Sequence, residues 1–238
     1  MRHGDCKGLN EGIINGWKDL PLTAKGKKEA VKAAENITKL LGNVKVDKIY
    51  SSYLSRTNDT ALIFADAINF KGKVKKDIRL NERHYGMFQG MVKEDAMSFK
   101  EYNTLSLSDK RLDNKLIPEN DIRHNATLNE YSMKLKKPIK KIEGIIPRSE
   151  SVLDVEERLI EFLKDEILIK SNENKTIVIV SHANPIKLAV KYLEGLTFKK
   201  TSKLRFATCS MKIYDMRYKD EKYEIVSEYN INKEWEEV

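Results

Sequence analysis

Three short segments of the chain place histidine beside side chains suited to phosphate chemistry: Arg2-His3-Gly4, Asn81-Glu82-Arg83-His84-Tyr85-Gly86 and Ser181-His182-Ala183-Asn184. The sequence contains four histidines, and three of them lie in these segments. Any one of them is more often a surface or buried structural residue than a catalyst. Together, imidazole, guanidinium and one carboxylate supply what phosphoryl transfer to nitrogen needs: a nucleophile, cations for the phosphoryl oxygens and a proton donor for the leaving oxygen.

Two of these segments come directly after a predicted strand. Thr176–Val180 is a β-branched apolar run, which predicts a fully buried strand ahead of His182. Val74–Leu80 predicts a shorter strand ahead of Glu82. Loops at the carboxyl ends of strands are where α/β sheets bind ligands, so these segments are the candidate ligand-binding loops.

Hydrophobic periodicity predicts the remaining elements. Helical spacing marks Thr23–Leu41, Arg56–Phe70 and Ser151–Ile169. Strand-like patterns mark Val44–Tyr50, Phe206–Met216 and Tyr223–Tyr229. Pro185 suits the first turn of a further helix. This alternation predicts one α/β domain over residues 1–238 with a mostly parallel sheet, and the polar stretch 87–147 predicts a lid-like insertion.

The composition argues against several classes of protein. The chain carries 44 Lys and Arg against 36 Asp and Glu, a net charge of +8. Such an excess is typical of solvated helix faces or of an anionic ligand, and nucleic acid ranks low because no zinc-finger, helix-turn-helix, RRM or KH signature occurs. The longest aliphatic stretch, near Ile177–Val180, is far shorter than the ~18–20 residues of a spanning helix. With no secretory signal and no disulfide framework from Cys6 and Cys209, we expect a cytoplasmic protein.

Six motifs occur in order along the chain: RHG at 2–4, GWKDLPLTAKGKKEA at 16–30, SSYLSRTNDTA at 51–61, LNERHYGMFQG at 80–90, SES at 149–151 and SHANPIKLAVKYL at 181–193. With these motifs the chain resembles the histidine phosphatase superfamily, and within it the 2,3-bisphosphoglycerate-dependent phosphoglycerate mutases. RHG alone is weak evidence, whereas LNERHYG followed by QG separates the mutases from the simple phosphatases. The resemblance extends from Arg2 to about Tyr229, and it implies a three-layer α/β/α fold around the parallel sheet.

The resemblance implies a role for five catalytic residues. His3 would be the nucleophile and would carry a phosphoryl group on its imidazole between two half-reactions. Arg2, Arg56 and His182 would surround that group and stabilise the equatorial oxygens of the transition state. Glu82 would be the general acid and base, giving a proton to one oxygen of the substrate and taking one from the other.

The resemblance also implies a set of substrate-binding residues. It includes Arg2, Arg56 and Glu82 from the catalytic set. The others would contact the carboxylate, the second phosphate or the phosphoryl oxygens: Asn10, Asn15, Gly16, Arg83, Tyr85, Lys93, Lys110, Arg111, Ala183 and Asn184. Lys110 and Arg111 match a basic pair that closes over the site, in a stretch where the alignment can shift by one residue.

The chain departs from the family at a few positions near the phosphate. The family has a serine and an asparagine after RHG where this chain has Cys6 and Leu9, with Asn10 one place later. Asn15 replaces a threonine and keeps a hydrogen-bonding group, and Ala183 replaces a glycine. These changes spare the nucleophile, its cations and the acid, so they bear on substrate affinity more than on the class of reaction.

The leading hypothesis is the interconversion of 2- and 3-phosphoglycerate in glycolysis and gluconeogenesis, through a phosphohistidine primed by 2,3-bisphosphoglycerate. The alternatives are a bisphosphoglycerate mutase or phosphatase on the same scaffold, and a catalytically weakened phosphate-binding relative. 2,3-Bisphosphoglycerate is the one expected cofactor, and no metal is expected because no ligand spacing of His, Asp or Cys occurs. The expected partner is a small phosphorylated substrate, with a homo-oligomer left open and neither nucleic acid nor a membrane expected.

The start of the chain differs from that of the resembled family. There RHG ends a buried apolar strand in the middle of the sheet, whereas here only Met1 precedes Arg2. A strand of this kind contributes hydrogen bonds of ~0.5–1.5 kcal/mol each and buried aliphatic side chains of ~1.5–3 kcal/mol each. We therefore expect residues 1–238 alone to be poorly stable and weakly active, with a natural start several codons upstream.

Overall fold

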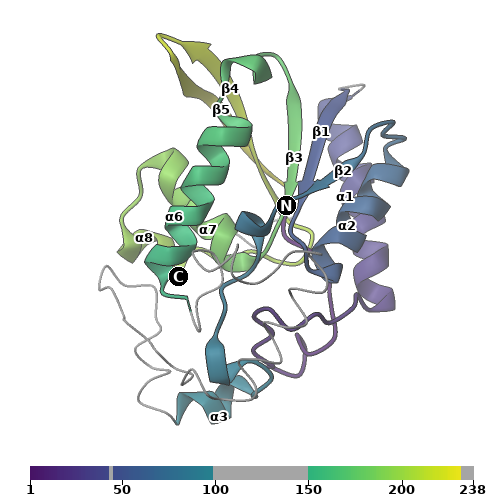
Figure 1. Cartoon of the computed structure of the whole chain (residues 1–238). Helices are drawn as coiled ribbons and strands as arrows, with labels where there is room; N and C mark the ends of the chain where they lie inside the picture. Colours follow the sequence, from purple (N-terminus) through teal and green to yellow (C-terminus); the bar gives the residue numbers. More distant parts are fainter. Residues whose placement is uncertain (43–44, 99–149, 232–238) are drawn as a thin grey trace, which may run out of the picture.

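The computed structural model describes residues 1–42, 45–98 and 150–231 (Figure 1). Its centre is a parallel sheet in the order β2-β1-β3, formed by β1 (Val46–Ser51), β2 (Val74–Lys76) and β3 (Thr176–Val180). Ser51 at the end of β1 is in register with Lys76 on one side and Val180 on the other. The carboxyl ends of all three strands therefore meet at one edge, and the loops that follow them start there.

Helices cover both faces of this sheet, so the predicted three-layer α/β/α arrangement is confirmed (Figure 1). One face carries α1 (Ala24–Leu41) and α2 (Ser55–Ala67), and the other carries α6 (Val152–Phe162) and α7 (Ala183–Glu194). Successive residues of a strand point to opposite faces. Ile49 accordingly belongs to the core that contains Phe64 of α2, whereas Tyr50 packs edge to face on Phe162 of α6.

Short polar side chains and glycine set the ends of these helices. Thr23 accepts a backbone N–H of the first turn of α1, and Ser151 and Asp154 form a reciprocal capping box at the start of α6. Gly195 ends α7 in the left-handed conformation. His182 is the N-cap residue of α7, so the turn from β3 into α7 delivers this histidine to the carboxyl edge of the sheet.

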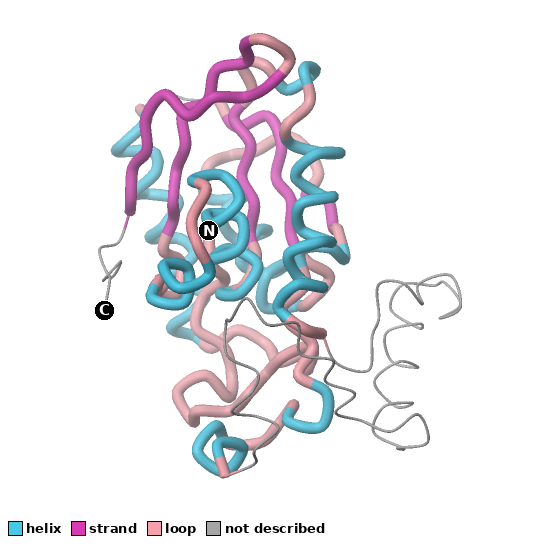
Figure 2. The backbone as a smooth tube through the Cα atoms, turned by 90° about the vertical axis from the view of Figure 1, so that its left-hand side faces the viewer, coloured by secondary structure: helices cyan, strands magenta, loops and turns pink. Residues whose placement is uncertain are grey.

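An antiparallel hairpin of β4 (Met211–Lys219) and β5 (Lys222–Ile231) stands beside the parallel sheet as a separate two-stranded unit. A cleft of about 1270 Å³, lined largely by aliphatic side chains, lies between the edge strand β3 and β4. Met1 and Arg2 bridge its end: the Met1 amine donates to the Ile179 carbonyl (2.8 Å), and the Arg2 N–H donates to the Ser210 carbonyl (3.1 Å). Figure 2 shows the N-terminus between the hairpin and the parallel strands.

Two predicted elements, one strand and one helix, are shorter than the sequence predicts. The predicted strand Val74–Leu80 is wrong beyond Lys76, because the Asp77 carboxylate accepts the Arg79 N–H and starts a 3₁₀ turn, Ile78–Leu80. The α-helix predicted over Ser151–Ile169 ends at Phe162 and continues as a π-helical turn, Leu163–Ile167.

The predicted strand Phe206–Met216 starts later than expected, at Met211. The chain first makes a turn in which Cys209 has a positive φ of 55° and the Ser210 N–H donates to the Ala207 carbonyl. This turn also gives the Cys209 N–H to the Arg2 carbonyl (3.2 Å), so it holds the segment that carries the RHG motif.

The remaining described elements are short: α3 (Lys93–Met97), α8 (Phe198–Lys203) and the 3₁₀ turns Gly86–Phe88 and Lys170–Asn172. The predicted lid at 87–147 lies outside the described residues from 99 onward. Within the described ranges, no helix is both long and apolar enough to cross a membrane.

Candidate active site

His3 lies buried at the carboxyl edge of the sheet, where its backbone N–H donates to the Ser181 carbonyl (3.0 Å). Its Nδ1 is 2.7 Å from the Gly4 carbonyl oxygen. A carbonyl oxygen accepts but never donates, so Nδ1 carries the proton and Nε2 keeps its lone pair. Burial, followed by the charges of Arg56 and Arg2, holds the pKa of His3 well below its usual value. The imidazole is therefore neutral at neutral pH and has a nucleophilic nitrogen.

The backbone around His3 is held by close contact with α1 and α2. A Cβ on Gly4 would lie 2.5 Å from the Gly26 carbonyl oxygen, and a Cβ on Gly26 would lie 2.0 Å from the Asp5 carbonyl oxygen. No side chain fits at such distances, so both positions require glycine. The Gly4 N–H also donates to Thr60 Oγ1 on α2 (3.0 Å). The backbone that carries His3 is therefore held by contacts with two helices.

Two arginines, the buried Arg56 and the half-buried Arg2, flank His3 and keep donor capacity for a ligand. Arg56, in the first turn of α2, donates through both Nη atoms to the Gly16 and Lys18 carbonyls (2.7 and 2.8 Å). Arg2 donates from Nη1 to the Phe206 carbonyl (2.5 Å). The Nε atoms of both arginines are buried without a hydrogen-bond partner among the described residues. Each guanidinium is thus anchored at its end while its Nε–H can still bind an anion.

His182 lies beside His3, as the family resemblance implies. The two rings meet edge to face with centroids 5.1 Å apart. Burial, followed by the charge of Arg56, holds the pKa of His182 well below its usual value. Its Nε2 is 2.9 Å from Ser52 Oγ, whereas its Nδ1 is buried without a partner among the described residues.

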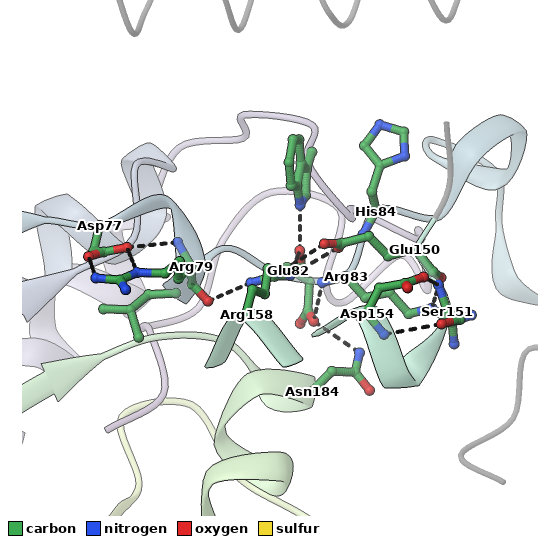
Figure 3. A network of polar contacts seen from close by, with 12 residues as sticks. Asp77, Arg79, Glu82, Arg83, His84, Glu150, Ser151, Asp154, Arg158 and Asn184 are labelled. Carbon is green, nitrogen blue, oxygen red and sulfur yellow. Dashed lines mark hydrogen bonds and ion pairs between the residues drawn. The ribbon is translucent and has the colours of Figure 1, made fainter. Parts of the chain in front are cut away.

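The Glu82 carboxylate is oriented by two hydrogen bonds to one of its oxygens (Figure 3). Glu82 Oε1 accepts the backbone N–H of Arg83 (2.8 Å) and Nδ2 of Asn184 (2.9 Å). The same Asn184 nitrogen also donates to the Tyr85 hydroxyl (2.8 Å), so it ties the loop after β2 to the start of α7. Because both bonds go to Oε1, the second oxygen remains able to give or take a proton.

A buried ion pair supports the loop that carries Glu82 (Figure 3). Arg158 of α6 pairs with Glu150 (2.6 Å), and its Nη2 donates to the Glu82 carbonyl (3.0 Å). Glu150 accepts the His84 N–H (2.8 Å), and its carbonyl accepts Nε of Arg83 (2.7 Å). These hydrogen bonds are all made to groups of the protein, and they offset the cost of burying the two charges. The pair therefore positions the Glu82 backbone.

Several predicted substrate-binding residues lie around these groups. Asn15 Nδ2 donates to the Lys7 carbonyl (3.3 Å) and lies 3.4 Å from Cys6 Sγ. The Arg83 guanidinium stacks over the Tyr85 ring at 5.3 Å. Ala183 is the first residue of α7.

The other predicted binding residues lie farther out or beyond the described ranges. Asn10 is exposed, with its Nδ2 3.5 Å from Asp5 Oδ2, and Lys93 is exposed at the start of α3. Lys110 and Arg111 fall outside the described residues.

Sequence reasoning missed three groups near the site. The Glu150–Arg158 pair and Ser52 carry no role in the sequence prediction, although Glu150 and Ser52 both lie within quoted motifs. Lys187 follows Asn184 by one turn of α7, and its pKa is lowered to about 8 by burial and by the charges of Arg205, Arg2 and Lys93, against the opposite effect of Glu82. Helical spacing from Asn184 is the signal that could have found Lys187.

The described residues hold no group of three or more His, Cys, Asp or Glu side chains that could bind a metal ion. The site instead combines a neutral imidazole nucleophile, two charged guanidinium groups with unused donors, a second imidazole and an oriented carboxylate. These are the parts that transfer a phosphoryl group to and from nitrogen.

Comparisons with known proteins agree with this chemistry. The model of the histidine phosphatase superfamily (branch 1) matches residues 1–115 and 119–231. The chain is 34% identical over 216 residues to a 2,3-bisphosphoglycerate-dependent phosphoglycerate mutase of Buchnera aphidicola, covering 90% of this chain and 91% of that protein. It is 31% identical over 220 residues to phosphoglycerate mutase 1 of Saccharomyces cerevisiae, covering 91% and 85%.

A solved structure shares the fold. The phosphoserine phosphatase of Entamoeba histolytica, solved in complex with 3-phosphoglyceric acid, superimposes with a TM-score of 0.65 at 23% identity, covering 98% of this chain and 95% of that one. The family match spans nearly the whole chain, and His3 lies buried within the matched region. The chain belongs to the histidine phosphatase superfamily.

Proposed function

We propose that the chain is a 2,3-bisphosphoglycerate-dependent phosphoglycerate mutase, which interconverts 2- and 3-phosphoglycerate. The observation that carries this proposal is a set of buried polar atoms near a neutral His3 that have no partner in the described part of the chain: Arg2 Nε, Arg56 Nε and His182 Nδ1. Buried polar groups without partners are costly, and a phosphoryl group bound at His3 would satisfy several of them at once. The relatives named phosphoglycerate mutase, at 31% and 34% identity, support the choice of substrate.

In the first half-reaction, the bisphosphorylated donor phosphorylates His3. The Nε2 lone pair attacks phosphorus while the bond from phosphorus to the ester oxygen breaks. Arg2 and Arg56 offset the charge on the equatorial oxygens, and Glu82 gives its proton to the leaving oxygen. The Nδ1–H bond to the Gly4 carbonyl keeps the ring in place throughout.

In the second half-reaction, a hydroxyl of the monophosphoglycerate takes the phosphoryl group back from His3. The Glu82 carboxylate accepts the proton of that hydroxyl as the new P–O bond forms and the P–N bond breaks. Asn184 and the Arg83 N–H bind Oε1 of Glu82 in both halves, so the other oxygen handles the proton each way.

An assay on 3-phosphoglycerate, with and without added 2,3-bisphosphoglycerate, tests this proposal. Phosphorus NMR would follow both monophosphate esters, the bisphosphate and inorganic phosphate, with His3→Ala as the inactive control. We expect 2-phosphoglycerate to form only after priming by the bisphosphate. Inorganic phosphate as the main product would identify a phosphatase, and ligand binding without turnover would identify a weakened relative.

A further inference from the structure

A row of buried hydrogen bonds connects His182 to the start of α2. His182 Nε2 is 2.9 Å from Ser52 Oγ, which is 2.5 Å from Thr57 Oγ1. Thr57 Oγ1 in turn is 2.7 Å from the Leu54 carbonyl oxygen. His182, Ser52 and Thr57 are all fully buried. The side chains of this row are therefore shielded from solvent, and their hydrogen bonds go to other groups of the protein.

The direction of each bond follows from the carbonyl at the end of the row. The Leu54 carbonyl only accepts, so Thr57 uses its one hydroxyl hydrogen there. Thr57 Oγ1 must then accept the hydrogen of Ser52, which leaves Ser52 Oγ with lone pairs only. One lone pair accepts the Leu54 N–H (3.2 Å), and the other accepts a hydrogen from His182 Nε2.

His182 is therefore held with its hydrogen on Nε2. In a neutral ring this leaves Nδ1 with a lone pair, and Nδ1 is the buried atom without a partner among the described residues. A lone pair repels an anion, whereas a protonated Nδ1 would donate to it. His182 can thus bind a phosphoryl oxygen only after it gains a proton.

The charges around His182 oppose that proton until an anion arrives. After burial, the charges that lower the pKa of His182 are those of Arg56, Arg158 and Arg2, and His3 adds to them only when it is itself protonated. A dianion bound beside His3 places negative charge near Nδ1 and so favours the protonated ring. His3 already donates through Nδ1 to the Gly4 carbonyl, and its Nε2 must stay unprotonated to be a nucleophile.

We propose that Ser52 and Thr57 are positioning residues that hold His182 as the Nε2–H tautomer, so that binding of a phosphate-like dianion beside His3 is coupled to the uptake of one proton at His182 Nδ1. The proposal rests on the proposed function in so far as the pocket must bind a tetrahedral dianion. Phosphohistidine formation then takes place with His182 as an imidazolium that neutralises part of the phosphoryl charge.

Sulfate is the probe, because it keeps two negative charges across the neutral pH range and cannot supply the proton itself. If one proton is taken up on binding, the Kd for sulfate rises about tenfold per pH unit between about pH 6 and pH 8. Calorimetry in buffers of different ionisation enthalpy should give the same uptake of one proton. A Kd that does not change with pH would overturn the proposal.

Variants of the row separate this role from a merely structural one. In Ser52→Ala the Nε2 atom loses its acceptor, so neutral His182 can place its hydrogen on Nδ1 and the pH slope should fall toward zero. Thr57→Val, which lets the Ser52 hydroxyl turn toward His182, should do the same and serves if Ser52→Ala does not fold. Two control variants should keep the full slope. Thr57→Ser retains the hydroxyl group of the row, and Ser51→Ala changes the neighbouring serine, whose Oγ lies near Asn58 and not near His182. A full slope in both Ser52→Ala and Thr57→Val would overturn the proposal.

Nitrogen NMR with labelled histidine identifies the residue that takes the proton, since the chain contains four histidines. We expect sulfate to turn His182 from the Nε2–H tautomer into an imidazolium while His3 stays neutral. Protonation of His3 instead would overturn the proposal. A chain that shows this uptake at His182 but isomerises no phosphoglycerate would uphold the proton coupling and refute the mutase.

Discussion

Replacing Glu82 with glutamine is expected to lower kcat for phosphoglycerate isomerisation by about 10²–10⁴-fold. Glutamine keeps an oxygen that can accept the bonds from Asn184 and the Arg83 N–H, so the loop should keep its geometry. It cannot give a proton to the leaving oxygen or take one from the attacking hydroxyl. The loss should therefore appear in kcat with little change in KM, as for an interaction used in the transition state.

A substrate with an acidic leaving group sharpens this test. p-Nitrophenyl phosphate releases an anion that needs no protonation, so Glu82→Gln should phosphorylate His3 from it almost as fast as the unchanged protein. Glu161→Gln, at an exposed position of α6, is the matched control and should leave both rates unchanged. A loss of the same size on both substrates, or none on phosphoglycerate, would remove Glu82 from the role of acid and base.

Filling the cleft between β3 and β4 with an apolar strand is expected to raise the stability of the fold markedly. Arg2 already pairs in parallel with Ser181 next to β3, and the Met1 amine donates to the Ile179 carbonyl. Residues joined ahead of Met1 would continue this pairing along β3 into the aliphatic cleft. Each ladder bond is worth ~0.5–1.5 kcal/mol and each buried aliphatic side chain ~1.5–3 kcal/mol.

The measurement is thermal unfolding of the chain with five added Val and Ile residues, compared with five added Gly and Ser residues. A net gain of roughly 5 kcal/mol corresponds to a rise of about 10–20 °C in Tm at this size, and mutase turnover should rise with it. Equal melting temperatures for the two extended chains would show that the cleft does not accept a strand.

The buried amine adds a pH signature to the same experiment. Burial lowers the pKa of the Met1 amine from 8.0 to about 5, so between these values the unfolded chain binds a proton that the folded chain does not. The stability of residues 1–238 should therefore fall as the pH decreases from about 8 to about 5. An extension converts this amine into a peptide N–H, so that part of the pH dependence should vanish.

The parts of the fold and site that follow from local pattern could be predicted from the sequence. The β-branched run of β3 and the following Pro185 place His182 at the turn into a helix, and the structure confirms this. The end of β2 could not be predicted, because a single side chain, Asp77, captures the Arg79 N–H and turns the chain.

Groups that meet only through tertiary packing were beyond the sequence pattern. Ser52 and His182 are 130 residues apart, and Arg158 reaches the Glu82 carbonyl across 76 residues. No spacing rule connects such pairs, and their polar side chains look like those of any loop. The tautomer of His182 likewise depends on where one hydroxyl hydrogen of Thr57 goes.

The most direct test of the account is the site of phosphorylation. After incubation with 2,3-bisphosphoglycerate, intact-mass and peptide mass spectrometry should find one phosphate per chain, on the peptide that contains His3. The adduct should be labile in acid and stable in base, as expected of a phosphorus–nitrogen bond, and it should be absent from His3→Ala. A phosphate that persists in His3→Ala, or that maps to His182, would contradict the assignment of His3 as the nucleophile.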